Sequence, residues 1–376
     1  MRDLVEIGMG REARRAYDLD QIEIVPSRRT RSSKVVSTHW QLDAYRFDIP
    51  LVTHPTDAVV SPSSAVAIGG LGGLAVLNAE GLWARHGDAE GALKRVVEAA
   101  TGDSPDSAVA LLQELHQAPV REDLIAEALR PVREAGHTVA ARVSPQRARE
   151  LTPALLAAGV EVLIVQGTIV SAEHVSQSGP EPLNLKDFIA DLDVPVVAGG
   201  VGDYRTALHL MRTGAAGVIV GYGQSAATTT DEVLGVGVPM ATAIVDAAAA
   251  RRDYLDETGG RYVHVLADGG IGTSGDIARA VACGADAVML GEQLAEADES
   301  PAGGLYWTSS AAHPSLPRSE VTGLARSGRS LEQVLFGPTD SPYGTTNLFG
   351  ALARALAKTG YSDLKEFQRV GLNLRV

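Results

Sequence analysis

The residues with the clearest chemical potential lie in one stretch, 263–291, which reads VHVLADGGIGTSGDIARAVACGADAVMLG. In it, an apolar run of strand length ends at Asp268, which two glycines follow, and a second such run ends at Gly291. Glycine turns at the carboxyl ends of adjacent parallel strands offer backbone N–H groups to phosphate oxygens, and a carboxylate there can accept ribose hydroxyl groups. The glycines could equally serve only to turn the chain from strand to helix.

A helix must connect these two strands. Thr273 and Asp276 have the spacing of a capping box, which predicts that the helix begins there. Ile277, Ala280 and Val281 then repeat at helical spacing and form one buried face. The stretch therefore reads as strand, glycine turn, helix, strand and glycine turn.

The same alternation runs through the whole chain. Near-continuous apolar strands that alternate with helices indicate a parallel sheet covered on both faces. Eight such strands predict an α/β fold that closes into a TIM (β/α)8 barrel, with an open doubly wound sheet as the structural alternative. The eight predicted strands are residues 50–53, 74–78, 138–143, 161–166, 194–198, 216–221, 263–267 and 286–290.

Composition narrows the class of protein. The chain has 376 residues, 45% of them hydrophobic, and a net charge of −13, which argues against a nucleic-acid partner. It contains no apolar run long enough to cross a membrane and no signal-peptide core, so we expect a cytoplasmic protein. A single cysteine, Cys283, excludes an internal disulfide and a cysteine-rich zinc site, and we expect no metal centre. Cys283 lies late on a predicted helix, on a packing face.

Two regions depart from the regular repeat. Residues 79–137 are longer than one barrel helix requires and predict a helical elaboration. Residues 299–345 are rich in Ser, Gly and Pro and follow the eighth strand, which predicts a flap over the barrel mouth. We expect a single domain, with residues 1–45 as an N-terminal extension and residues 46–376 as the barrel.

In order along the chain, these motifs resemble the IMP dehydrogenase / GMP reductase family. The likeness is strongest in 263–291 and covers most of the chain. The chain is most similar in its motifs to the shorter bacterial IMP-dehydrogenase-related proteins, which lack the tandem regulatory (CBS) domain. Further matching segments are PLV at 50–52 with Asp57, LAVLN at 74–78, AAGVEVL at 157–163, VLGVGVP at 233–239 and the tail from Pro342 to Val370.

The resemblance implies a thiolate nucleophile. In that family a cysteine in the loop after the sixth strand attacks the purine C2, a hydride leaves to NAD, and water hydrolyses the covalent intermediate. Here the loop is residues 220–231, VGYGQSAATTTD, and the cysteine position falls at Thr228. A threonine alcohol is far less acidic than a thiol and needs a strong adjacent base, which this loop does not supply.

The resemblance also places the remaining site residues. Around the substrate it implies three glycines and four polar side chains, namely Gly269, Gly270, Gly291, Asp268, Glu292, Ser225 and Thr229. Gly221, Gly223 and Gln166 fall where the family binds NAD, with Gln166 in place of an aspartate, and the 221–228 loop is where a monovalent cation would bind. A carboxylate at Glu292 would repel a phosphate unless a cation or an arginine intervened. His54, after the first strand, could donate a proton or could simply pack.

Three functions remain open at this point. By resemblance, the chain is an NAD-dependent oxidoreductase that converts IMP to XMP in purine (GMP) nucleotide biosynthesis. Loss of the nucleophile favours instead a catalytically inactive, nucleotide-binding or regulatory relative of IMP dehydrogenase, with a purine nucleoside monophosphate as its ligand. Retained polar groups such as His54 would also permit a barrel enzyme with changed chemistry. The resemblance further implies a homotetramer.

Overall fold

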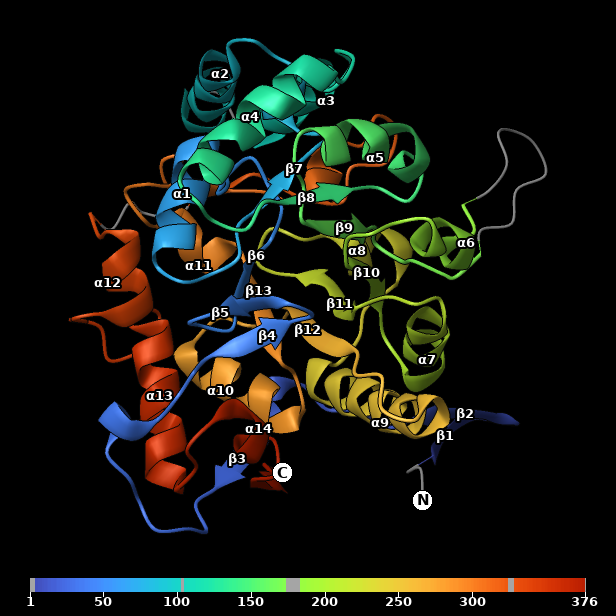
Figure 1. Ribbon diagram of the computed structural model, residues 1–376, viewed down its shortest axis with the longest axis vertical. Coiled ribbons are helices and arrows are strands. Elements are labelled where there is room, and N and C mark those ends of the chain that lie inside the picture. Colours follow the sequence, from blue (N-terminus) through green and yellow to red (C-terminus); the bar gives the residue numbers. More distant parts are fainter. Residues whose placement is uncertain (1–3, 103–104, 174–182, 324–327, 376) are drawn as a thin grey trace.

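The computed structural model describes residues 4–102, 105–173, 183–323 and 328–375, and its centre is a parallel sheet of eight strands (Figure 1). The order is β6-β13-β12-β11-β10-β9-β8-β7, and a parallel bridge from Val52 to Leu74 joins its two ends, so the sheet closes into a barrel. All eight predicted strands are confirmed, and the open-sheet alternative is excluded. They are β6 (Leu51–Thr53), β7 (Val76–Asn78), β8 (Ala140–Val143), β9 (Val162–Gln166), β10 (Val196–Val201), β11 (Gly217–Gln224), β12 (His264–Gly269) and β13 (Ala287–Leu290).

A helix follows each strand on the outside of the barrel (Figure 1). The predicted capping box is present, because Thr273 accepts a hydrogen bond from the N–H of Asp276 at the start of α10. The helix ends where Gly284 adopts a positive φ of 120°. The surrounding helices are α1 (Pro62–Gly70), α4 (Glu122–Glu134), α5 (Ala148–Ala157), α6 (Leu185–Ala190), α7 (Tyr204–Arg212), α9 (Met240–Thr258), α10 (Ser274–Cys283) and α13 (Leu348–Thr359).

The long connection between β7 and β8 contains three helices. These are α2 (Ala89–Gly102), α3 (Pro105–Leu115) and α4, which packs between α1 and α5 as the barrel helix. The pair α2 and α3 forms an added layer outside it (Figure 1). Within the described ranges, this connection is therefore a helical elaboration and not an inserted regulatory domain.

The segment after β13 folds over the mouth of the barrel. It contains α11 (Glu292–Ala295), β14 (Leu305–Tyr306), a 3-10 turn (Ser309–Ala312), β15 (Thr322–Gly323) and α12 (Leu331–Phe336). The turn packs against α3, so the flap and the helical elaboration meet. Tyr306 and Trp307 are both buried and anchor the flap to the barrel.

The N-terminal segment from Leu4 and the C-terminal segment to Arg375 cover the outside and the base of the barrel. The hairpin of β1 (Leu4–Gly8) and β2 (Arg11–Arg14) is tied to α9 by an ion pair between Arg14 and Asp246, and β3 (Ile22–Val25) pairs with β16 (Gly371–Leu374). A second hairpin, β4 (Trp40–Leu42) and β5 (Tyr45–Phe47), lies at the base, near α14 (Leu364–Phe367). We retain residues 1–45 as an extension of a barrel spanning 46–376 as a proposal. No helix among the described residues is long and apolar enough to cross a membrane.

Candidate functional site

A cavity of about 550 Å³ opens at the carboxyl ends of the strands. Because parallel strands all end at the same edge, side chains from distant parts of the sequence meet there. The flap supplies the remaining wall. Residues that line the cavity and enter the argument below are His54, Arg142, Gln166, Thr228, Asp268 and Arg318.

Asp268 lies at the end of β12 and is only 3% exposed. One carboxylate oxygen is 3.1 Å from Nδ1 of His54, and the other accepts a hydrogen bond of 2.7 Å from the side-chain amide of Gln166. A carboxylate at Nδ1 favours the imidazole tautomer that leaves Nε2 as an acceptor. Gln166 Oε1 is buried and has no hydrogen-bond partner in the described structure. Asp268 and Gln166 Oε1 can therefore accept hydrogen bonds from the hydroxyl groups of a ligand.

The loop after β11 approaches this group very closely. A Cβ on Gly221 would lie 2.2 Å from the Asp268 carbonyl oxygen, and one on Gly223 would lie 3.2 Å from the His54 ring. Both glycines have positive φ, so side chains are excluded by geometry as well as by space. Thr228 follows, and its hydroxyl donates a hydrogen bond of 2.6 Å to the Gly223 carbonyl and lies 3.0 Å from the hydroxyl of Ser225. Neither partner is a base.

The glycine turn after β12 is already engaged by this loop. The N–H of Gly270 donates to the Gln224 carbonyl at 2.9 Å, and a Cβ on Gly269 would lie 2.5 Å from the Gln224 backbone nitrogen. Both glycines have positive φ. Their conformation is thus required by the packing of two adjacent strand ends, and the Gly270 N–H is not free for a phosphate while this bond stands.

The second glycine turn is closed by side chains of the protein itself. Glu292, the first residue of α11, accepts a hydrogen bond of 3.2 Å from the N–H of Ala226. The ring of Tyr306 packs onto Gly291, where a Cβ would lie 2.5 Å from the phenol oxygen. Burial raises the pKa of Tyr306 well above its usual value, so the phenol stays protonated. A carboxylate and a phenol therefore occupy the space beside this turn.

Thr229 lies outside the cavity. Its N–H donates to the Arg318 carbonyl at 3.0 Å, and Thr228 forms a bridge with Ser319, so this part of the loop holds the flap. The structure thus brings Asp268, Gln166 and Thr228 together with Gly221 and Gly223 at the mouth. Ser225, Glu292 and Gly291 lie together beside it.

Sequence reasoning missed a group of arginines on the opposite wall. Arg142 on β8 is 9% exposed, and burial lowers its pKa. Arg85 follows β7 and is half-buried, and Arg318 comes from the flap. A signal for Arg142 exists in the sequence, because a charged residue interrupts the apolar strand 138–143, and a buried charge is costly unless it is paired or binds a ligand of opposite charge. Arg318 has no such signal, because only the folded flap brings it to the mouth.

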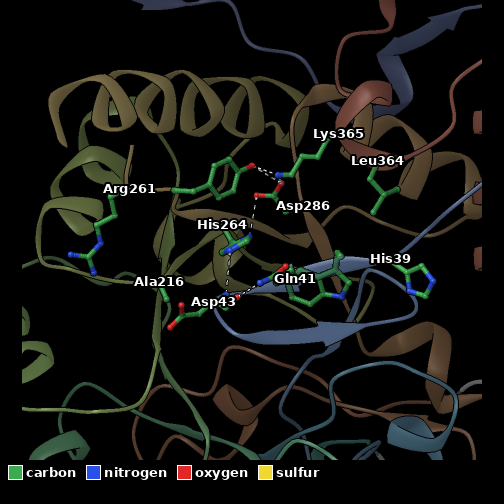
Figure 2. A pocket seen from close by; sticks show the side chains of 11 residues that line it. His39, Gln41, Asp43, Ala216, Arg261, His264, Asp286, Leu364 and Lys365 are labelled. Carbon is green, nitrogen blue, oxygen red and sulfur yellow. Dashed lines mark hydrogen bonds and ion pairs between the residues drawn. The ribbon is translucent and has the colours of Figure 1, made fainter. Parts of the chain in front are cut away.

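A second cavity, of about 520 Å³, lies at the other end of the barrel (Figure 2). The central group there is Asp286, which contacts Arg251 at 2.7 Å and also binds Lys365 and the hydroxyl of Tyr262. Charged partners hold the pKa of Asp286 below its usual range against the effect of burial. The carboxylate is fully engaged in linking α9, β13 and the C-terminal segment, which is a stabilising role typical of the base of such barrels.

Two further kinds of chemistry considered from the sequence are nucleophilic attack by Cys283 and metal binding. Cys283 is buried at the end of α10, and burial raises the pKa of its thiol to about 12. It therefore cannot act as a nucleophile at neutral pH. Among the described residues, no group of three or more His, Cys, Asp or Glu side chains is placed to hold a metal ion.

The closed barrel and the cavity at its carboxyl edge define the chain as a (β/α)8 barrel of the kind whose sites lie at that edge. A family model described as the IMP dehydrogenase / GMP reductase domain matches residues 16–313. The chain belongs to the IMP dehydrogenase / GMP reductase family, which confirms the resemblance seen in the sequence.

Similar proteins span the whole chain. A protein named as an uncharacterized oxidoreductase in Mycobacterium leprae (strain TN) is 66% identical over 98% of this chain and 99% of its own length. A crystal structure of an IMP dehydrogenase/GMP reductase-like protein from Corynebacterium glutamicum superposes with a TM-score of 0.94 and 55% identity, covering 99% of this chain and 98% of that one. By contrast, inosine-5'-monophosphate dehydrogenase of Haemophilus influenzae is 42% identical over only 40% of this chain and 29% of its own length.

Proposed function

We propose that this protein binds a purine nucleoside monophosphate at the barrel mouth and does not oxidise IMP to XMP by the thiolate route of its family. The observation that carries the proposal is Thr228. Its hydroxyl stands at the nucleophile's position and is bonded to the Gly223 carbonyl, and its contacts include no base. Without a base, a threonine alcohol does not form the alkoxide that attack on the purine C2 requires.

The polar groups that remain are suited to binding. Asp268 is held rigidly by His54 and Gln166, and the unpaired oxygen of Gln166 lines the same cavity. Ribose hydroxyl groups can donate to Gln166 Oε1 and to Asp268, which would satisfy a buried acceptor that is otherwise costly to leave unpaired. The retained Asp268 thus supports nucleotide recognition independently of catalysis.

If NAD also binds, its ribose would take Gln166 Oε1, and the ribose of the monophosphate would then be held by Asp268 alone. NAD would supply a hydride acceptor when bound, and Gln166 together with Gly221 and Gly223 would form its contact surface. A monovalent cation at the 221–228 loop stays a proposal from the family relationship. The carbonyls of Gly223, Gln224 and Ser225 each accept one hydrogen bond within the protein, and each keeps a second lone pair that a cation can use. We retain a homotetramer and a cytoplasmic location as proposals from the family relationship.

The contact between His54 and Asp268 favours a second candidate, an oxidoreductase without a covalent intermediate. A histidine oriented by a carboxylate can take a proton from a substrate hydroxyl group, and with Nδ1 held by Asp268 the nitrogen that would do so is Nε2. The relatives named as oxidoreductases agree with this class. It differs from the first candidate in that NAD would be reduced in the presence of a suitable alcohol.

Replacement of Asp268 tests the binding proposal. Asp268→Asn removes the charge but keeps the shape, and we expect it to weaken binding of IMP in calorimetry by about 1.5–3 kcal/mol, the value of a hydrogen bond to a charged group. Asp256→Asn is the matched control, because Asp256 is exposed at the far end of α9. Equal affinities for both variants would remove Asp268 from the binding site.

A further inference from the structure

The arginine that lines the mouth from β8 is incompletely paired. Nη2 of Arg142 donates 2.7 Å to the Gln166 carbonyl, and Nη1 lies 3.5 Å from the side-chain oxygen of Asn78 and 3.7 Å from Glu80. Its Nε is buried and has no hydrogen-bond partner among the described residues. A guanidinium that is nine-tenths buried normally has all of its donors satisfied. The unpaired donor therefore points to a missing acceptor.

The flap brings a second incompletely paired guanidinium to the same place. Nη1 of Arg318 donates 3.0 Å to the Leu316 carbonyl, and Nη2 lies 3.3 Å from the hydroxyl of Thr168, two residues beyond the carbonyl that binds Arg142. Its Nε is also buried without a hydrogen-bond partner in the described structure. Burial lowers the pKa of Arg318, and its hydrogen bonds to the described residues go to neutral oxygens. Two guanidinium groups thus face one strand end, that of β9.

The charge on this wall is positive. Arg85 is held by the carbonyl oxygens of Glu80, His116 and Ala118, and none of these is a carboxylate. Against three guanidinium groups stand the side chain of Glu80 and the buried Asp57, whose pKa burial raises to about 7. In a partly desolvated site, this excess of positive charge favours a bound anion.

The opposite wall of the mouth carries negative charge. Glu292 and Asp268 lie at the ends of β13 and β12, which are across the barrel from β8 and β9 in the strand order. The glycine turns there are occupied by Glu292, Tyr306 and Gln224. An anionic ligand is therefore repelled from one side of the mouth and attracted to the other.

We propose that Arg85, Arg142 and Arg318, here called the arginine wall, form a subsite for an oxyanion of the ligand, either a phosphate or a carboxylate. The proposal rests on nucleotide binding as proposed above and sets its orientation. The phosphate of a nucleotide lies at the ends of β8 and β9, and the ribose lies toward Gln166 and Asp268. The paired donors of a guanidinium match the oxygens of either anion.

Arg318→Met tests the arginine wall, because among the described residues it removes only hydrogen bonds to the Leu316 carbonyl and the Thr168 hydroxyl, and it keeps the aliphatic stem. Inorganic pyrophosphate and citrate are titrated by calorimetry, and the thermal midpoint without ligand reports folding. Loss of one charge-assisted contact is expected to weaken the tighter of the two anions about ten- to hundredfold. Arg252→Met, on the exposed face of α9, gives the same change of net charge and is expected to leave the affinity unchanged.

Arg142→Met is the second variant and is expected to weaken the same anion. Unchanged affinity in a folded Arg318→Met protein, or equal loss in Arg252→Met, would overturn the arginine wall, as would failure of both anions to bind the wild type. A preference for pyrophosphate identifies a phosphate ligand, and a preference for citrate identifies a carboxylate. If the anions bind through Arg318 but IMP, GMP and AMP do not bind, the subsite stands and the proposed nucleotide function fails.

Discussion

Introducing a thiol at the nucleophile's position tests how much of the family chemistry this loop still supports. In Thr228→Cys, the new side chain replaces a hydroxyl whose hydrogen bonds to the described residues are with the Gly223 carbonyl and the Ser225 hydroxyl. Neither contact stabilises a thiolate. We therefore expect the thiol to keep an ordinary pKa near 8.5, with about a tenth ionised at pH 7.5.

Alkylation of the native cysteine should contribute very little signal to this measurement. The chain has one cysteine, Cys283, whose pKa burial raises to about 12. At pH 7.5 the thiolate fraction at a pKa of about 12 is lower than at 8.5 by a factor of about 3,000, which sets the difference in alkylation rate before access is considered. Labelling with iodoacetamide, followed by intact-protein mass spectrometry, should yield one adduct in the variant and none in the wild type.

The pH dependence of labelling distinguishes two accounts of the loop. We expect the rate to rise about fivefold from pH 7.5 to 8.5, as ionisation at an ordinary pKa requires. We also expect no NADH from IMP and NAD, since Glu292 still fills the space beside the last glycine turn. A labelling pKa well below 7, or steady NADH formation, would refute this reasoning and show that only the sulfur was missing.

Two further expectations concern Glu292 and the base of the barrel. Glu292→Gln removes a negative charge beside the glycine turns. If the phosphate of IMP lay at those turns, this change would tighten binding by about 1–2 kcal/mol. With the phosphate on the arginine wall we expect less than a threefold change in affinity by calorimetry, and a tenfold tightening would contradict that orientation. Burial lowers the pKa of His264 to about 4, so its contribution to stability is present above pH 6.5 and is lost as pH falls toward 4. Between pH 7.5 and 4.5, the free energy of unfolding measured with urea should fall by about 2 kcal/mol more in the wild type than in His264→Gln. Equal decreases in the two proteins would show that His264 does not cause the pH dependence.

Much of the barrel could be predicted because it depends on local patterns. Each strand is a short apolar run that ends at glycine or a polar residue, and the helix after β12 begins at a capping box. Closure then follows from the number of repeats. The position of the α2 and α3 pair outside α4 could not be predicted, because it depends on packing between helices of similar character.

The site was predicted only in part. Asp268 and Gln166 lie at the carboxyl ends of parallel strands and Thr228 lies in the loop after one, so the strand pattern in the sequence predicts that the three meet. The engagement of Gly270 by Gln224, and of the Ala226 N–H by Glu292, depends on contacts between loops that are distant in sequence. Arg318 reaches the mouth only through the path of the flap. Such long-range contacts leave no periodic signal in the chain.

The central claim, nucleotide binding without thiolate-dependent oxidation, is tested most directly by one paired measurement on the wild-type protein. IMP is titrated by calorimetry, and NADH formation from IMP and NAD is then followed at the same protein concentration. The account predicts saturable binding of IMP and no NADH above the rate without enzyme. Steady NADH formation would contradict the role given to Thr228, and the absence of binding would contradict the role given to Asp268.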